Sequence, residues 1–164
     1  MPNHMILLVE DSAGDARLMR EAFQACNEFI RLQVATDGLE AMAFLRQEGP
    51  HADSQRPDLI LLDLNMPRMN GLQVLAEVKA DEALRSIPVV VLTTSEAEAD
   101  IAASYDLQVN CYLIKPADLD EFEGLVKGIN DFWIKKARLP SQSRSTRPQR
   151  SEAHETAIVG ASEA

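Results

Sequence analysis

Cysteine is scarce, and long apolar runs are missing. Cys26 and Cys111 are the two cysteines among 164 residues, and they lack the close spacing of a zinc site or a redox pair. Apolar runs such as residues 87–92 fall far short of the roughly 20 residues that cross a membrane. Residues 5–9 are too few for a signal peptide and lack preceding basic residues. We therefore expect a soluble, cytoplasmic protein with reduced thiols and no membrane partner.

Positive charge is also in deficit. The chain has 16 Lys and Arg residues against 26 Asp and Glu residues, for a formal net charge of −10. Three Arg and three Glu cancel in the last 24 residues, so the deficit lies in residues 1–140. A domain this acidic repels a phosphate backbone, which argues against a nucleic-acid partner. The chain has neither a GxGxxG nor a GxxxxGK phosphate loop, so those routes to nucleotide binding are unsupported.

Composition changes once along the chain. Apolar residues make up 46% of the whole, which is ordinary for a globular protein. From residue 141 onward, Ser, Arg, Glu and Ala dominate, and such a segment buries too little surface to offset its ordering entropy. Pro140 marks the boundary because a helix usually ends before proline. We expect one domain over residues 1–140 and a disordered tail over residues 141–164.

Residues 1–140 alternate between two hydrophobic patterns. Runs typical of strands buried on both faces occupy residues 5–9, 59–62, 89–92 and 112–114. A fifth run, over residues 32–35, alternates more and is expected at a sheet edge. Helical periods occupy residues 16–25, 38–46, 72–80, 97–105 and 119–137. This order predicts an α/β fold, a doubly wound (βα)5 parallel sheet with right-handed crossovers.

Polar side chains follow four of the predicted strands. Glu10 and Asp11 come after the first strand, Asp63 after the third, Thr93 after the fourth and Lys115 after the fifth. Ligands of such sheets bind at the carboxyl ends of the strands, where these groups would converge. Carboxylates about 4 Å apart repel by roughly 4 kcal/mol at an effective dielectric near 20, so one lysine is too little counter-charge for three of them. A bound Mg²⁺ would supply the rest, which predicts a phosphoryl-transfer site with a carboxylate nucleophile.

Each of these signals has an ordinary explanation when taken alone. Ser12 or Asp15 could cap the first helix, and Asp63 could begin a simple turn. The hydroxyl of Thr93 could be a helix cap, and Lys115 could mark a strand exit. Their occurrence at four successive strand ends favours a shared site over coincidence.

Four motifs carry a family resemblance. LLVEDS, LILLDLNMPRMNG, IPVVVLTTS and YLIKPADL stand at the expected strand ends, and through them residues 5–136 resemble a receiver domain of the two-component response-regulator family. The resemblance implies a flavodoxin-like sheet with strand order 2-1-3-4-5. It also implies that Asp63 accepts a phosphoryl group from a histidine kinase and that Lys115 contacts a phosphoryl oxygen. Chemistry would then be limited to self-phosphorylation and self-dephosphorylation, so we do not expect an enzyme.

The resemblance also assigns a metal site. Glu10 and Asp11 would place Mg²⁺, with Asp11 the more direct ligand. Asp63 would contribute its carboxylate and Asn65 its backbone carbonyl. Mg²⁺ is therefore the cofactor that we expect.

A conformational switch is the third implication. Thr93 would move to hydrogen-bond the phosphoryl group, and Tyr112 would turn inward on activation. Pro116 would follow a cis peptide bond that fixes the loop and so aims Lys115.

Features outside the site narrow the resemblance. Residues 105–112, the sequence Asp131-Phe132-Trp133 and the following residues 138–140 are similar to response regulators that partner bacterial phytochromes. We expect no DNA-binding output domain, because only 24 residues follow residue 140 in this sequence. We therefore expect a single-domain response regulator that is phosphorylated by a bacteriophytochrome kinase and relays the signal to a downstream protein of unknown identity.

Two other functions remain open from the sequence. A haloacid-dehalogenase-like phosphatase also uses an aspartyl phosphate, but it needs a second Asp two residues after the nucleophile, where this chain has Asn65. A pseudo-receiver would bind partners without phosphorylation, but such proteins typically lose the acidic pair, the acceptor Asp or the Lys.

The final helix points to self-association. A helix from about residue 118 to residue 138 would be about 30 Å long, and a five-residue strand spans only about 17 Å. The overshoot carries large apolar residues that face too many directions for one core-facing stripe. We expect a homodimer through the fourth helix, fifth strand and fifth helix, with an interface that includes Phe122, Phe132 and Trp133. The alternative is that residues 132–134 cap the bottom edge of the sheet or pack under Leu139 and Pro140.

Overall fold

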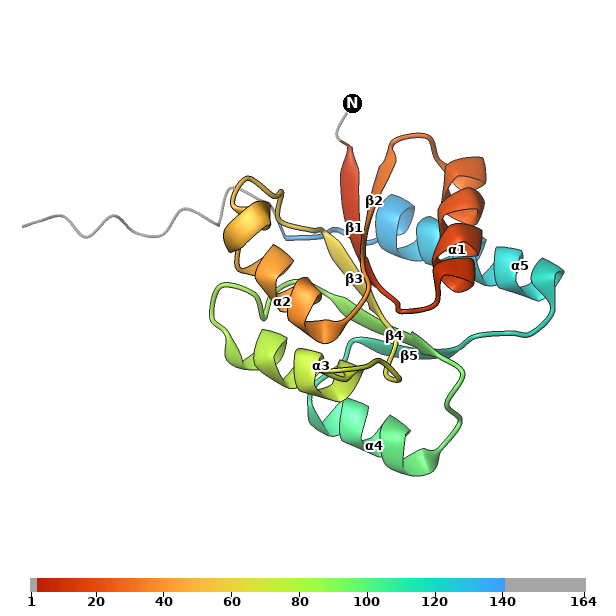
Figure 1. Cartoon of the computed structure of the whole chain (residues 1–164). Helices are drawn as coiled ribbons and strands as arrows, with labels where there is room; N and C mark the ends of the chain where they lie inside the picture. The colour runs from red at the N-terminus through yellow and green to blue at the C-terminus, as the bar shows by residue number, and fades with distance from the viewer. Residues whose placement is uncertain (1–2, 141–164) are drawn as a thin grey trace, which may run out of the picture.

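The sheet is parallel throughout. The computed structural model describes residues 3–140 and contains five strands in the order β2-β1-β3-β4-β5 (Figure 1). Their bounds are His4–Val9 for β1, Ile30–Ala35 for β2, Leu59–Leu62 for β3, Val89–Thr93 for β4 and Cys111–Ile114 for β5. The predicted α/β class, flavodoxin-like topology and strand order 2-1-3-4-5 are confirmed.

Helices cover both faces of the sheet (Figure 1). The helices are α1 (Ala13–Cys26), α2 (Gly38–Leu45), α3 (Gly71–Ala80), α4 (Glu98–Asp106) and α5 (Leu119–Ile129), with a short 3-10 helix at Gly49–His51. Apolar side chains of α1 and α5 share one core layer, and those of α2 and α3 share the other. None of the helices in residues 3–140 is both long and apolar enough to cross a membrane.

The central strands supply both core layers in alternation. Leu7 and Leu62 are fully buried on the α2 and α3 side, and Ile6 and Leu61 are fully buried on the α1 and α5 side. Successive side chains of a strand point to opposite faces, so a run without polar residues suits a strand covered on both sides. The runs of β1, β3 and β4 therefore follow the sequence pattern closely.

The two edge strands are less buried than the centre. Strand β2 exposes Arg31, as expected for the alternating run. Strand β5 is half-buried at all four residues, so the prediction that it is buried on both faces is wrong. The reason is its position, because an edge strand has a neighbour on only one side, whatever its composition.

Polar caps begin the helices close to the sheet. Ser12 caps α1 by accepting a hydrogen bond from the Asp15 amide, which confirms one of the two caps that the sequence allowed. Asp37 caps α2 in the same way. Asn70 and Gln73 form a reciprocal capping box at the start of α3. Each cap fixes the residue at which its helix begins. The caps therefore also fix one end of each loop that joins a strand to the next helix.

The last helix changes from α-helical to π-helical geometry along its length. Helix α5 ends at Ile129 and continues as a π-helical segment, Asn130–Lys136, so the single regular helix expected over residues 119–137 is only partly present. The wider turns let Ile134 reach the core while Phe132 stays exposed at 56%. Insertion of a wide turn is the usual way for a helix to shift its buried face. The predicted tail over residues 141–164 lies outside the described residues.

Candidate functional site

Four strands end at one buried polar site. Glu10 follows β1, Asp63 follows β3, Thr93 is the last residue of β4, and Lys115 follows β5. All four are buried, with exposed fractions of 2%, 7%, 0% and 9% respectively. The structure therefore brings together the strand ends that the sequence predicted. Buried charges are rare unless they are paired or bind a ligand, which marks this edge of the sheet as functional.

Lys115 is the positive centre of the site. Its ammonium Nζ donates to Asp63 Oδ2 at 3.1 Å and to Asp15 Oδ2 at 3.0 Å, and it makes a shorter ion pair with Glu10 Oε2. The three carboxylates come from the ends of β1 and β3 and from helix α1. One positive charge thus faces three negative charges, which leaves the site short of positive charge.

A second group of carboxylates fits a metal ion. Oxygen atoms of Glu10, Asp11 and Asp63 all lie within 4.8 Å of one another, and Asp11 is exposed while the other two are buried. Loop amides orient two of the carboxylates: Ser12 N donates to Glu10 Oε1 at 3.1 Å, and Asn65 N donates to Asp63 Oδ1 at 3.2 Å. Hard carboxylate oxygens in such a cluster are the donor set that Mg²⁺ takes, so the residues fit the predicted cofactor.

Burial and charge act in opposite directions on the central ion pair. Burial raises the pKa of Glu10 from its ordinary 4.5 to about 7, although the hydrogen bond and charge of Lys115 oppose this shift. Burial alone would lower the pKa of Lys115, but its contacts with Glu10, Asp63 and Asp15 outweigh burial and raise it. Lys115 therefore stays charged, while Glu10 shares that one charge with other carboxylates and gains a proton more easily.

Thr93 and Tyr112 are joined through a third residue. The Tyr112 hydroxyl donates to the backbone carbonyl of Ser95 at 2.8 Å, and Ser95 N donates to Thr93 Oγ1 at 3.4 Å. Burial raises the pKa of Tyr112, so its hydroxyl stays protonated as a donor. The two predicted switch residues therefore share the β4–α4 loop as a common contact.

The loop after Asp63 is tightly packed. A Cβ atom added to Gly71 would lie 2.7 Å from Leu64 Cα, which is closer than real Cβ atoms approach. Arg68 has a φ of 64° and forms an ion pair with the buried Asp37 at the start of α2. That ion pair and two backbone hydrogen bonds in the loop hold the chain that carries Asp63 and Asn65.

Comparison with known proteins agrees with this geometry. A family model described as the response regulator receiver domain matches residues 6–127. The chain belongs to this family. It is 50% identical over 140 residues to Response regulator Rcp1 of Synechocystis sp., which covers 85% of this chain and 95% of Rcp1. Membership of this family, together with the presence of Glu10, Asp11, Asp63 and Lys115, favours neither the phosphatase nor the pseudo-receiver.

Solved receivers have the same architecture. The crystal structure of the phosphorylated cyanobacterial phytochrome response regulator RcpA has a TM-score of 0.82 and 52% identity, covering 85% of this chain and 99% of that one. The Mn²⁺-bound form of response regulator Rcp1 has a TM-score of 0.79 and 49% identity, and the match covers 84% of this chain and 99% of that one. The bacteriophytochrome response regulator AtBRR is 38% identical with a TM-score of 0.65, and the match covers 84% of this chain and 98% of that one. The resemblance to phytochrome-associated response regulators is therefore confirmed.

Two site predictions are wrong in this structure, and one residue was missed. Residues 3–140 contain no cis peptide bond, so the bond before Pro116 is trans; trans is favoured by about 0.5–1 kcal/mol, and Lys115 reaches its partners with it. Phe122 is 5% exposed and packs in its own core, so it is unavailable to an interface. Asp15, expected at most to cap α1, instead contacts Lys115. No residue spacing signalled this contact, because Asp15 and Lys115 are 100 residues apart in the sequence.

Proposed function

We propose that Asp63 accepts a phosphoryl group from a histidine kinase. The observation that supports this proposal is the buried Asp63 carboxylate, 3.1 Å from the Lys115 ammonium and clustered with Glu10 and Asp11. A carboxylate oxygen attacks the phosphorus of a phosphohistidine, the P–N bond breaks, and the imidazole nitrogen keeps the electron pair. The product is an acyl phosphate on Asp63, and the protein's own chemistry is limited to forming and hydrolysing this bond.

Lys115 and a bound Mg²⁺ would together neutralise the negative charge of the transferring phosphoryl group. Lys115 donates to Asp63 in the resting protein and is placed to donate to a phosphoryl oxygen instead. Glu10, Asp11, Asp63 and the backbone carbonyl of Asn65 would hold Mg²⁺, which supplies positive charge to the transferring group. The amide of Asn65 holds one Asp63 oxygen in place through a 3.2 Å hydrogen bond, which orients the nucleophile.

The donor that we propose is a bacteriophytochrome kinase, and the signal passes to a downstream protein. Support comes from the similarity to the cyanobacterial phytochrome response regulator RcpA and to the bacteriophytochrome response regulator AtBRR. The test is a phosphotransfer profile, in which wild type and Asp63→Asn are mixed with the autophosphorylated histidine kinases of the source organism. We expect rapid transfer from a phytochrome kinase to wild type and none to the variant. Transfer to both proteins, or from no kinase, would contradict the proposal.

We propose that the phosphoryl group acts through Thr93 and Tyr112. Because both contact Ser95, movement of the Thr93 hydroxyl toward Asp63 would release that loop and free the Tyr112 hydroxyl to turn inward. Thr93→Ala should still accept phosphate but lose coupling to Tyr112. Crystal structures with and without beryllofluoride that show Tyr112 in one rotamer would refute this switch.

We also propose a homodimer through α4, β5 and the end of α5. Phe132 is 56% exposed and packs edge-on against Trp133 with ring centroids 5.2 Å apart, and β5 pairs with β4 alone. An exposed aromatic ring and an unpaired sheet edge are both features typical of interfaces, and the partly buried Trp133 links the Phe132 ring to the core. Sedimentation at micromolar concentration should show a dimer for wild type and a monomer for Phe132→Ala/Trp133→Ala. A wild type that stays monomeric with and without beryllofluoride would exclude this dimer.

A further inference from the structure

Asp15 is the one exposed partner of an otherwise buried lysine. It is the third residue of α1, and its Oδ2 lies 3.0 Å from the Lys115 ammonium nitrogen. Its side chain is 40% exposed, whereas those of Glu10 and Asp63 are 2% and 9% exposed. Asp15 therefore keeps contact with water while it holds Lys115, and its charge costs less desolvation than the other two.

The three carboxylate partners of Lys115 differ in whether they also belong to the oxygen cluster with Asp11. An ammonium group has three hydrogens, and here three carboxylates from three segments accept from it. Glu10 and Asp63 also belong to the oxygen cluster with Asp11, but Asp15 is not in that cluster. A cation held by the cluster would compete with Lys115 for Glu10 and Asp63, and the contact of Lys115 with Asp15 would remain.

The charge balance leads to the same conclusion. A cation in the cluster and the Lys115 ammonium repel each other, because like charges at this range interact by several kcal/mol even when partly screened. The Asp15 carboxylate, which contacts the ammonium but lies outside the cluster, offsets that repulsion. The backbone of Asp15 is fixed independently, since its amide donates to Ser12 Oγ at 3.2 Å. The backbone that carries this carboxylate is therefore held by the start of α1 and not by Lys115.

We propose that Asp15 is a positioning residue that holds the Lys115 ammonium toward the phosphoryl site while Glu10 and Asp63 serve the cation. This inference rests on the proposed function, because it assigns a part in the same site. Asp15 does not touch the transferring group and acts only through Lys115. Without it, Lys115 would keep two shared partners in the metal-free protein and only weakened ones in the loaded protein.

The test compares Asp15→Ala, Asp15→Asn and Asp15→Glu with wild type. Glu21→Gln is the matched control, because Glu21 lies on the same helix and pairs with the exposed Arg17. The first readout is the proton–nitrogen NMR signal of the Lys115 ammonium, recorded without metal and again with Mg²⁺ alone. The second is the rate of phosphorylation by phosphoramidate at saturating Mg²⁺.

We expect the ammonium signal in every metal-free protein. On addition of Mg²⁺ it should be lost in Asp15→Ala, weakened in Asp15→Asn, and retained in wild type, Asp15→Glu and Glu21→Gln. The phosphorylation rate should fall about tenfold in Asp15→Ala, less in Asp15→Asn, and stay within about threefold of wild type in Asp15→Glu. A signal that survives Mg²⁺ in Asp15→Ala, or a wild-type rate in that variant, would overturn the proposal. If Asp15→Ala fails to fold, Asp15→Asn decides, because its amide keeps the shape without the charge.

The two possible failures can be separated. If wild type takes up no phosphate from any donor, the proposed function fails, and the NMR comparison with Mg²⁺ still tests Asp15. If wild type is phosphorylated normally and the Asp15 variants match it in both readouts, the proposed function stands and Asp15 serves only as part of the start of α1.

Discussion

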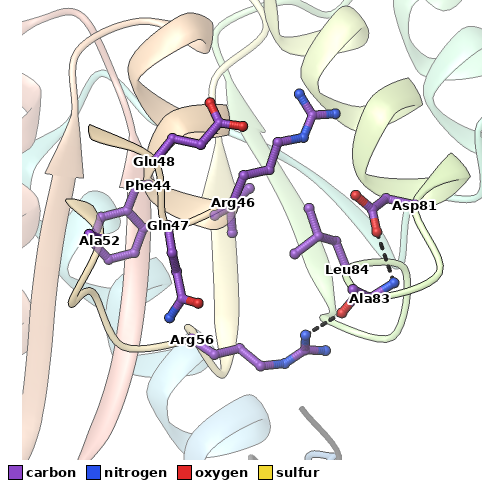
Figure 2. A pocket seen from close by; sticks show the side chains of 10 residues that line it. Phe44, Arg46, Gln47, Glu48, Ala52, Arg56, Asp81, Ala83 and Leu84 are labelled. Carbon is purple, nitrogen blue, oxygen red and sulfur yellow. Dashed lines mark hydrogen bonds between the residues drawn. The ribbon is translucent and has the colours of Figure 1, made fainter. Parts of the chain in front are cut away.

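The strands end at the carboxyl edge of the sheet and begin at its amino edge. These two edges contain the same kinds of charged side chain in opposite settings. At the carboxyl edge, Lys115 is 9% exposed and faces three carboxylates. At the amino edge, a cavity of about 710 Å³ is lined by Arg46, Glu48, Arg56 and Asp81 (Figure 2). There, Arg56 reaches the Ala83 carbonyl and Asp81 accepts from the Ala83 amide, so charged groups meet ordinary backbone partners.

The difference lies in burial and balance rather than in residue type. The amino-edge ion pair of Arg46 and Glu77 spans 2.9 Å, with both side chains about two-fifths exposed. Water screens such a pair, and it contributes little to stability or chemistry. At the carboxyl edge, Glu10, Asp63 and Lys115 are buried and negative charge is in excess, so these groups respond strongly to an added cation or phosphoryl group. The contrast between the two edges supports the carboxyl edge as the place of the proposed chemistry, and four predictions test it.

The largest contrast should be between Lys115→Met and Arg46→Met. Loss of Lys115 leaves buried carboxylates without their counter-charge, so we expect a loss of about 3–5 kcal/mol in the free energy of unfolding. Loss of Arg46 breaks an exposed pair and should cost less than about 1 kcal/mol. Urea unfolding at pH 8 measures both. Equal losses in the two variants would remove the distinction between the edges.

A second contrast uses two glycines. Gly71 packs against the backbone of Asp63 and Leu64, so Gly71→Ala should overpack the loop and cost about 3 kcal/mol while lowering phosphorylation. Gly49, near the amino edge, has open space around it but a φ of 55°, so Gly49→Ala should cost about 1 kcal/mol through strain alone. Thermal unfolding and a phosphoramidate assay distinguish them. A tolerated Gly71→Ala would show that the site loop is looser than the structure indicates.

The third prediction concerns pH in the metal-free protein. The pKa of folded Glu10 is about 7 against an ordinary 4.5, so between these values the folded state binds more protons than the unfolded state. The free energy of unfolding should therefore fall as pH rises through that window, by at most about 1.4 kcal/mol per pH unit. Glu10→Gln should remove this contribution, and the surface variant Glu77→Gln should keep it. Identical pH dependence in wild type and Glu10→Gln would contradict the assignment.

The smallest effect should come from Asp81→Asn at the amino edge. The Asn side-chain oxygen can still accept from the Ala83 amide, so stability should change by less than about 0.5 kcal/mol. Mg²⁺ affinity and phosphorylation should match wild type. A change in either would show that the amino edge is coupled to the site.

The sequence predicted the parts of the molecule that depend on local pattern. Strand β3 was predicted with its observed bounds because a four-residue apolar run between polar residues has few alternatives. The groups at the strand ends were also predicted, because the topology of a parallel sheet is enough to bring Glu10, Asp63 and Lys115 together. The contact of Asp15 with Lys115 depends on side-chain reach from a helix, which period and composition do not encode.

Other differences arise from tertiary context. The half-burial of β5 follows from its place at the edge of the sheet, although its composition matches that of a central strand. The π-helical turn after Ile129 reflects a conflict between continuing the helix and burying Ile134. Phe122 has the apolar character of an interface residue, and only the packing of α5 on the sheet shows that it belongs to the core.

Fluorine NMR of beryllofluoride binding tests the central claim most directly. With Mg²⁺ present, wild type and Asp81→Asn should both show bound fluoride signals, and Asp63→Asn should show none, because the attachment point is the Asp63 carboxylate at the buried edge. The Lys115 ammonium signal should shift at the same time, as Lys115 exchanges Asp63 for a fluoride. Bound signals that persist in Asp63→Asn, or their absence from wild type, would contradict the account.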